Sequence, residues 1–337
     1  MKRHLTLMLT LLLVLALFAG CAKTAAPVEE TAEPEKPAAV PAAEKEEVIE
    51  EEEDEENYET GDASLDDIRN QDEIGEDEIL VVSFGTSYND NRRLTIGGIE
   101  NAIAEAFPDW SVRRGFTAQI IIDHVERRDG LHIDNVSEAL ERAIDNGVKR
   151  LIVQPTHLMA GIEYEELEET LAEYADAFET VVLGANLLNT DEDFEKVEQV
   201  MVDIMSEYDD GETAIVYMSH GTEHESNAIY AKMQELLTAD GYENYYVGTV
   251  EAEPSLDDVV EAIADKGYTR VVLHDMMVVA GDHANNDMAD PEDPESWYSV
   301  FKAAGYEVEA VLNGLGEVPE IQQMYVGKVQ DSIDSLE

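Results

Sequence analysis

Three residues of this sequence carry the side chains of an open metal site: His220, Glu251 and His283. His220 and Glu251 come directly after apolar runs that read as buried β-strands, and His283 follows a third run after several residues. Two imidazoles and one carboxylate suit a borderline divalent ion such as Co²⁺, Fe²⁺, Ni²⁺ or Zn²⁺, and their spacing does not choose among these ions. We therefore expect a metal site built from these three residues.

Other residues compete for the same roles or support them. A lone histidine is more often structural, and most glutamates are solvated, so Glu253 competes with Glu251. His224 reads as a surface or supporting residue, and His157 follows another predicted strand and either faces the site or is structural. A carboxylate often orients a metal-binding imidazole, and either Asp282 or Asp287 could orient His283.

An internal repeat supports the selection of the three residues. The run RLIV at 150–153, followed by Ala160-Gly161, recurs 120 positions later as RVVL at 270–273, followed by Ala280-Gly281. Ser83-Phe84-Gly85-Thr86 likewise matches Ser219-His220-Gly221-Thr222, and Gly115-Phe116-Thr117-Ala118 matches Gly248-Thr249-Val250-Glu251 more loosely. In these alignments Phe84, Ala118 and Glu163 stand where the second copy has the three site residues. A repeat describes how a chain folds, and polar changes at equivalent loops indicate where function was added.

The elements that must position these residues alternate between strand and helix. Short apolar runs predict strands at 78–84, 110–117, 150–153, 180–183, 213–218, 245–250, 270–274 and 307–312. Helical spacing predicts helices at 92–107, 136–146, 164–178, 194–208, 228–238, 256–266, 296–304 and 320–333. This alternation predicts an α/β fold of two similar Rossmann-like domains, each a parallel sheet flanked by helices, with a central cleft between them. Ligands of such sheets bind outside the carboxyl ends of the strands.

The N-terminal part of the chain does not read as part of this fold. Lys2 and Arg3 precede an apolar run and Ala19-Gly20-Cys21, which predicts a lipoprotein signal peptide at 1–21, with an uncleaved anchor as the alternative. Cys21 is the only cysteine, so its lipidation leaves no thiolate for a metal or a disulfide. We expect a membrane-anchored, extracytoplasmic protein with an acidic disordered linker at 22–77. The predicted domains are then 78–208 and 209–337, the second of which carries the metal site.

Charge and missing motifs exclude several functions. The net charge is −56, and Glu50–Glu56 is a run of seven acids, which argues against nucleic acid as a partner. The sequence contains no GxxxxGKS, GxGxxG or GxSxG pattern, so we expect no nucleotide cofactor and no serine-hydrolase site. The sequence does not determine the oligomeric state, and a homo-oligomer is possible.

Five segments together resemble the anaerobic sirohydrochlorin cobaltochelatases of the CbiK type, which are class II chelatases. These segments are SFGTS at 83–87, QPTH at 154–157, SHGTEH at 219–224, GTVE at 248–251 and AGDHA at 280–284 with Asn286-Asp287-Met288. The resemblance covers about 78–330. It implies insertion of Co²⁺ into sirohydrochlorin during cobalamin biosynthesis, and it implies that His220, Glu251 and His283 bind the metal.

This chemistry must remove two pyrrole protons as the ion enters the macrocycle. We expect His220 to act as general base and ligand, with Glu251 and His283 holding the ion. The substrate carries carboxylates, and the arginine doublets 92–93, 113–114 and 127–128 either bind them or are ordinary structural charges. The alternative function is a non-catalytic surface lipoprotein that binds metal, a tetrapyrrole or haem for capture or transport. A hydrolase that uses the same site is the weakest alternative, because no nucleophile or water-activating motif accompanies it.

Overall fold

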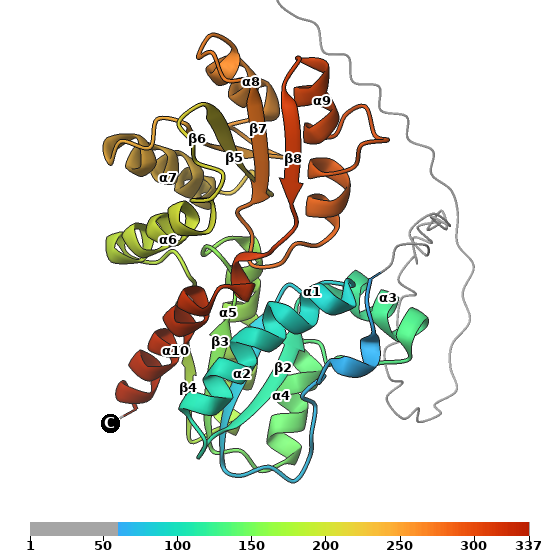
Figure 1. Cartoon of the computed structure of the whole chain (residues 1–337). Helices are drawn as coiled ribbons and strands as arrows, with labels where there is room; N and C mark the ends of the chain where they lie inside the picture. Colours follow the sequence, from blue (N-terminus) through green and yellow to red (C-terminus); the bar gives the residue numbers. More distant parts are fainter. Residues whose placement is uncertain (1–59, 337) are drawn as a thin grey trace, which may run out of the picture. The chain divides into compact units, whose positions relative to one another are not determined.

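The computed structural model describes residues 60–336, which belong to one compact unit (Figure 1). The predicted signal peptide, Cys21 and most of the predicted linker lie outside the described residues. Within 60–336, every helix is too short or too polar to cross a membrane.

The strands of the described part form two parallel sheets of four strands each (Figure 1). The first sheet has the order β2-β1-β3-β4 and the second has the order β6-β5-β7-β8. The strands are β1 (Asp77–Ser83), β2 (Ser111–Phe116), β3 (Arg150–Pro155), β4 (Thr180–Leu183), β5 (Thr213–Ser219), β6 (Tyr245–Thr249), β7 (Arg270–Asp275) and β8 (Glu307–Val311). The central strands are buried almost throughout, because helices cover both faces of each sheet. The predicted α/β fold of two similar sheets is confirmed.

The helices agree with the predicted periodicity except in the first repeat. They are α1 (Asn89–Leu94), α2 (Ile96–Ala106), α3 (Gln119–Asp129), α4 (Val136–Asp145), α5 (Ile162–Tyr174), α6 (Asp191–Ile204), α7 (Ala228–Ala239), α8 (Leu256–Ala264), α9 (Trp297–Ala303) and α10 (Pro319–Asp334). The single helix predicted at 92–107 is two helices, since the chain bends at Thr95, whose hydroxyl donates to the Asn91 carbonyl at 2.6 Å. Helix α3 was not predicted; it is mostly polar and buries only Ile122 and Val125.

Backbone hydrogen bonds confirm the repeat residue by residue. In the first sheet, Thr117 N donates to Ser83 O at 2.9 Å and Ala118 N donates to Phe84 O at 3.2 Å. In the second sheet, Val250 N donates to Ser219 O at 2.9 Å and Glu251 N donates to His220 O at 2.8 Å. The looser alignment of Ala118 with Glu251 is therefore correct, because both residues make the same bond to the neighbouring loop.

The two halves exchange their closing helices. Helix α6 follows the first sheet but packs against α7, where Lys232 Nζ lies 3.7 Å from the centre of the Phe194 ring and 2.6 Å from Asp191 Oδ1. Helix α10 follows the second sheet but packs against α2 and β3, and the Tyr325 hydroxyl donates to the Thr156 carbonyl at 2.6 Å. The predicted division at 208/209 separates the two sheets, whereas each closing helix packs on the other half.

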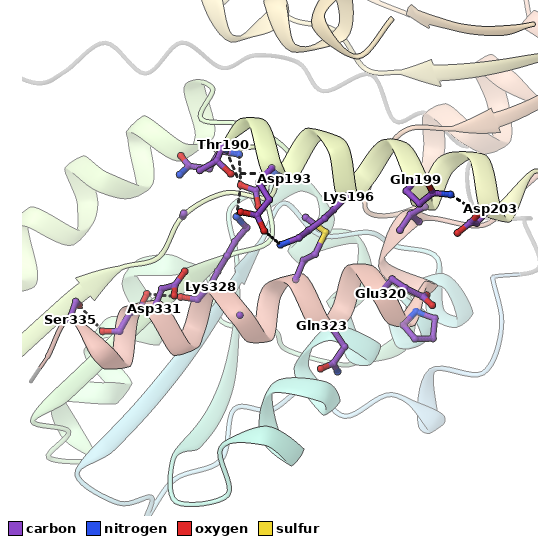
Figure 2. A pocket seen from close by; sticks show the side chains of 18 of the residues that line it. Thr190, Asp193, Lys196, Gln199, Asp203, Glu320, Gln323, Lys328, Asp331 and Ser335 are labelled. Atoms are coloured by element: carbon purple, nitrogen blue, oxygen red, sulfur yellow. Dashed lines mark hydrogen bonds and ion pairs between the residues drawn. The ribbon is translucent and has the colours of Figure 1, made fainter. Parts of the chain in front are cut away.

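The exchanged helices, α6 and α10, meet along a groove of about 950 Å³ (Figure 2). Lys328 of α10 is 8% exposed and donates to Asp193 Oδ2 of α6 at 3.1 Å. Lys196 pairs with Glu192 on α6 at 2.8 Å. Because the lysines of the groove are paired with its own acids, we interpret it as the junction between the two helices.

The folded part begins earlier than residue 78, which corrects the predicted linker. Residues 60–76 are hereafter called the strap. Their middle part lies at the free edge of β2, where Arg114 N donates to Arg69 O and Gln71 Nε2 donates to Val112 O, each at 3.2 Å. The strap also contains a short 3₁₀ helix, η2 (Ala63–Leu65), and its Asp66 side chain is 1% exposed. Acidic composition predicted disorder, but buried arginines of the folded part neutralise Asp66, as described below.

Candidate metal centre

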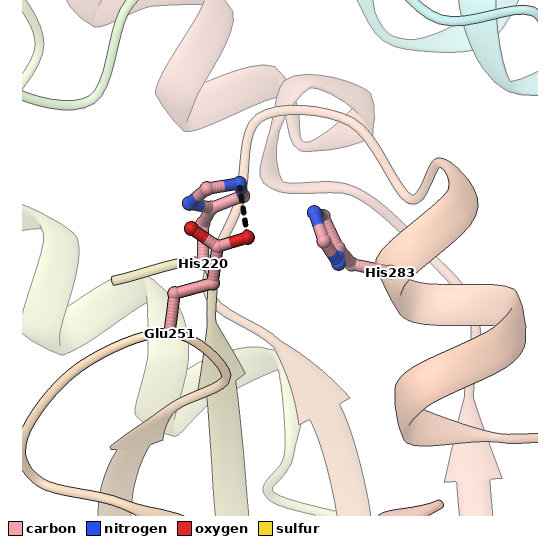
Figure 3. Close-up of side chains that lie close together, drawn as sticks. All are labelled: His220, Glu251 and His283. Carbon is pink, nitrogen blue, oxygen red and sulfur yellow. Dashed lines mark ion pairs between the residues drawn. The ribbon is translucent and has the colours of Figure 1, made fainter. Parts of the chain in front are cut away.

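The three predicted residues converge at the carboxyl end of the second sheet (Figure 3). His220, Glu251 and His283 each offer one ligand atom, and these atoms all lie within 4.8 Å of one another. His220 follows β5, Glu251 follows β6 and His283 lies in the helical segment after β7. Neighbouring parallel strands end at the same edge of a sheet, which is how residues far apart in the sequence meet here.

The backbone after β5 fixes the direction and the tautomer of His220. Gly221 has a φ of 85°, and a Cβ at this position would lie 2.8 Å from Thr249 Cβ, so only glycine fits the turn. His220 Nδ1 lies 2.7 Å from the Gly221 carbonyl, which can only accept, so Nδ1 carries the proton. The lone pair is therefore on Nε2, the atom that faces Glu251 (Figure 3).

Glu251 is held next to His220 by the backbone bond between their two loops. Its Oε1 lies 3.9 Å from His220 Nε2, and its side chain is 56% exposed. Two ligands about 2 Å from one ion lie roughly 3–4 Å apart, so this separation fits a shared cation.

His283 is oriented by Asp287, one of the two acids predicted for that role. His283 Nδ1 donates to Asp287 Oδ2 at 2.6 Å, one helical turn away, where the chain forms the π-helical turn η5 (Ala284–Met288). The hydrogen bond and charge of Asp287 outweigh burial and raise the pKa of His283 above its ordinary value. The His283 and His220 rings meet edge to face with their centres 4.5 Å apart. Asp282 instead accepts a hydrogen bond from Asn286.

The remaining predicted histidines lie outside this cluster. Both ring nitrogens of His157 are buried without a hydrogen-bond partner, and burial lowers its pKa to about 4. His224 bonds to Ser226 through Nδ1, and its Nε2 lies 3.4 Å from Glu165 of the first half. His224 therefore connects the two halves rather than joining the three site residues.

A second group with ligand-like spacing was not predicted: His132, Asp134 and Glu138. The short separation of these three residues in the sequence is the signal from which the group could have been predicted. Both oxygens of Asp134 already accept hydrogen bonds from Arg142, at 2.6 and 3.1 Å, and Glu138 Oε2 accepts from the Asn135 amide as part of a helix cap. Because the Arg142 guanidinium already neutralises Asp134, we interpret this group as structural.

The first half exposes apolar side chains at the sheet edge that corresponds to the donor-atom edge of the second half. Phe84 is 47% exposed after β1, Ile120 is 76% exposed after β2, and Ile162 is 48% exposed after β3. The two isoleucines were not predicted, since sequence alone does not distinguish an exposed isoleucine from a core one. Exposed apolar side chains that cluster at a ligand-binding edge indicate a contact surface.

Loops from the carboxyl ends of the two sheets touch each other. A methyl group added at Gly281 would stand 3.3 Å from Thr86 Oγ1, and one added at Gly161 would stand 3.3 Å from Ser226 Oγ. Ala280 N also donates to Asn91 Oδ1 of α1 at 3.0 Å. The apolar edge of the first half thus lies on the same side as the metal-ligand edge of the second.

Four of the six arginines in the predicted doublets are paired with acids of the first half. Arg92, Arg113 and Arg114 are fully buried and paired with acids, and Arg128 pairs with Asp129 at 2.6 Å. These ion pairs favour the structural interpretation of these four arginines.

Comparison with known proteins identifies relatives of the whole folded part. The family described as cobalt chelatase (CbiK) matches residues 77–334. A sirohydrochlorin cobaltochelatase of Salmonella typhimurium is 36% identical over 256 residues, which cover 76% of this chain and 96% of that protein. Sirohydrochlorin cobaltochelatase CbiKC of Nitratidesulfovibrio vulgaris is 26% identical over 278 residues, covering 81% and 97% of the two chains.

Solved structures agree on the fold. SirB from Bacillus subtilis with Fe³⁺ has a TM-score of 0.55 at 14% identity, with 78% of this chain and 98% of that chain covered. The sirohydrochlorin chelatase SirB of Bacillus subtilis subspecies spizizenii in complex with cobalt has a TM-score of 0.52 at 13% identity, with 77% and 97% covered. At these identities the likeness concerns the fold alone.

Proposed function

The chain belongs to the cobalt chelatase (CbiK) family, and on that premise we propose that it inserts Co²⁺ into sirohydrochlorin. The observation that carries the proposal is the convergence of His220, Glu251 and His283 at the carboxyl end of the second sheet. Two relatives that align over nearly their whole length are named for this reaction. The same donor set also suits Fe²⁺ and Ni²⁺, so the choice of metal is part of the test.

In this proposal the three side chains hold the incoming ion before transfer. His220 and His283 each present an Nε2 lone pair, because the Nδ1 of each is already hydrogen-bonded. Glu251 adds one negative charge, which offsets part of the charge of the ion. The partial exposure of all three side chains leaves room for the macrocycle to approach.

His220 then serves as general base. Transfer of Co²⁺ to the ring nitrogens frees the Nε2 lone pair, which accepts one of the two pyrrole protons. Glu251, 3.9 Å from that nitrogen and open to solvent, accepts the second proton and passes it to water. The ion replaces two protons, so the reaction needs no oxidant, reductant or nucleotide.

Phe84, Ile120 and Ile162 support a tetrapyrrole as the second substrate. A macrocycle has a broad apolar face, and burying such a face contributes about 25 cal/mol per Å². The exposed apolar side chains at the carboxyl ends of β1, β2 and β3 offer a matching surface on the half that lacks metal ligands.

The decisive experiment mixes purified protein with Co²⁺ and sirohydrochlorin and follows absorbance over many equivalents. We expect multiple turnovers, with Fe²⁺ and Ni²⁺ compared in parallel. The signal-peptide-like N-terminus favours a second candidate, a surface protein that captures metal, a tetrapyrrole or haem without catalysis. Formation of one equivalent of product or complex without further turnover would favour this candidate.

We also propose that lipidated Cys21 anchors the protein outside the cytoplasm. The basic start, the apolar run and the Ala19-Gly20-Cys21 sequence support this location. Labelled palmitate should enter the wild-type protein in cells, and Cys21→Ser should abolish both labelling and membrane fractionation. An unlabelled wild-type protein would contradict the anchor without bearing on the chelatase activity.

A further inference from the structure

We propose that the strap, residues 60–76, positions the metal-ligand loop of the second half through helix α1, with Asp66 as the central positioning residue. This inference rests on the proposed metal site. The strap lies before the residues matched by the family, which begin at residue 77.

The first step is a buried charge network between the strap and the first half. Asp66 Oδ2 accepts from Arg92 Nε at 2.7 Å and from Arg114 Nη1 at 2.8 Å. Asp66 is 1% exposed and both arginines are fully buried. Burial opposes ionisation of Asp66, but Arg114 and Arg92 outweigh it and hold the pKa of the carboxyl below its ordinary value. Without Asp66, Arg114 would keep Glu100 as a close acidic partner, whereas Arg92 would lose the carboxylate to which its Nε donates.

The second step connects this network to the start of α1. Arg92 lies in α1 and donates from Nη1 to the Thr86 carbonyl at 3.1 Å and from Nη2 to Asn89 Oδ1 at 2.6 Å. The beginning of the strap holds the same end of the helix, because Asp90 N donates to Thr60 O at 2.8 Å. Gly61 has a φ of 94°, and a Cβ there would overlap the Asp90 carboxylate at 2.3 Å. The strap therefore contacts α1 at two points.

The third step leads from α1 to His283. Asn91 of α1 accepts the Ala280 amide at 3.0 Å through Oδ1, and Thr86 lies against Gly281. Ala280 and Gly281 directly precede the helical turn that carries His283 and Asp287. Displacing α1 would thus move the loop that sets the distance from His283 to His220 and Glu251. A continuous chain of contacts of this kind can carry coupling between distant parts of a protein.

The test measures the affinity of the full chain for Co²⁺ from the visible absorption of the bound ion, in the absence of the tetrapyrrole. Asp66→Asn keeps the size of the side chain and removes its charge, and Gly61→Ala disturbs the exposed start of the strap without touching the buried arginines. We expect each variant to bind Co²⁺ about three- to tenfold more weakly than wild type. Asp67→Asn, which changes the same charge at an exposed neighbour, should leave the affinity unchanged.

Thermal unfolding of the same samples separates positioning from simple support. If the strap only stabilises the first half, the variants will unfold at lower temperature while Co²⁺ affinity stays at the wild-type value, and the inference is overturned. If Asp66→Asn does not fold, Gly61→Ala alone decides the question. If the wild-type protein binds no Co²⁺, the proposed metal site itself is wrong. If the wild type binds Co²⁺ and the variants bind it equally well, only the role of the strap is wrong.

Discussion

The two halves of the molecule share one strand order and one set of loop hydrogen bonds but differ in the side chains that follow the strands. Phe84, Ala118 and Glu163 occupy the first-half positions that correspond to His220, Glu251 and His283. The residues directly after β1 and β2 make the same backbone hydrogen bonds as those directly after β5 and β6, so at these positions the two halves differ in residue identity. We infer that the second half holds the ion and the first half contacts the macrocycle.

The substitution with the largest expected effect on turnover lies in the second half. His220→Ala removes the Nε2 lone pair, and we expect turnover to fall at least about 100-fold, the typical contribution of a positioned base. His224→Ala is the matched control, because His224 lies in the same loop but outside the cluster. Both are measured by the absorbance assay. Turnover of His220→Ala within tenfold of wild type would contradict the assignment.

Asp287→Asn should have the next largest effect, since it changes the orientation and basicity of His283. Loss of such an outer partner typically costs about tenfold or more in metal affinity. Asp287 raises the pKa of His283. In the wild type, protons therefore displace the metal from His283 at a higher pH than they would without Asp287. In Asp287→Asn the loss of Co²⁺ binding on acidification should therefore begin at lower pH. Titrations between pH 5 and 8 test this shift, and Asp282→Asn, which removes a smaller charge effect on His283 and no hydrogen bond to it, should shift the loss of binding less.

Phe84→Ala tests the first half, where we expect a change in tetrapyrrole binding and none in metal binding. Removing the partly exposed ring should raise the KM for sirohydrochlorin about fivefold, equivalent to about 1 kcal/mol. The Co²⁺ affinity of the protein alone should remain at the wild-type value. Phe84→Leu should restore part of the loss, and a KM unaffected by Phe84→Ala would show that the ring does not contact the macrocycle.

The smallest expected effect concerns the contact of the exchanged helix α6 with the second half. Burial, and then the charge of Asp240 at the end of α7, raise the pKa of Glu198 from 4.5 to about 7. The folded state then binds a proton more tightly than the unfolded state, so this group lowers stability as the pH rises from 4.5 through 7. Glu198→Gln should increase the free energy of unfolding by about 1 kcal/mol at pH 8 and change little at pH 4.5.

Urea unfolding at the two pH values measures this difference. Glu195→Gln on the exposed side of α6 should have a smaller effect, because the Glu195 charge is the last of the three causes that raise the pKa of Glu198. An equal effect of Glu198→Gln at both pH values would mean that the Glu198 carboxyl is not destabilised by its surroundings.

The sequence predicted the features that depend on local patterns. Alternating apolar runs located all eight described strands, and the repeat located His220, Glu251 and His283, because parallel strands bring their ends to one edge. Spacing could not choose between Asp282 and Asp287 as the partner of His283; the helical turn after β7 favours Asp287.

The features that were missed depend on contacts between distant segments. The strap is acidic and reads as linker, and only the buried Arg92 and Arg114 explain why Asp66 is ordered. The exchange of α6 and α10 likewise leaves no local signal, since an amphipathic helix has the same periodicity whichever sheet it covers.

The exchange of α10 has a consequence for the order in which the protein matures. Synthesis proceeds from the N-terminus, so the face of α2 and β3 that α10 covers has no partner until residues 319–334 have been made. Ile321, Tyr325 and Val329 are fully buried there, in a core that both sheets share. The first half therefore completes its packing only when α10 has been made, and a nascent chain shorter than about 319 residues presents an apolar surface to chaperones or proteases.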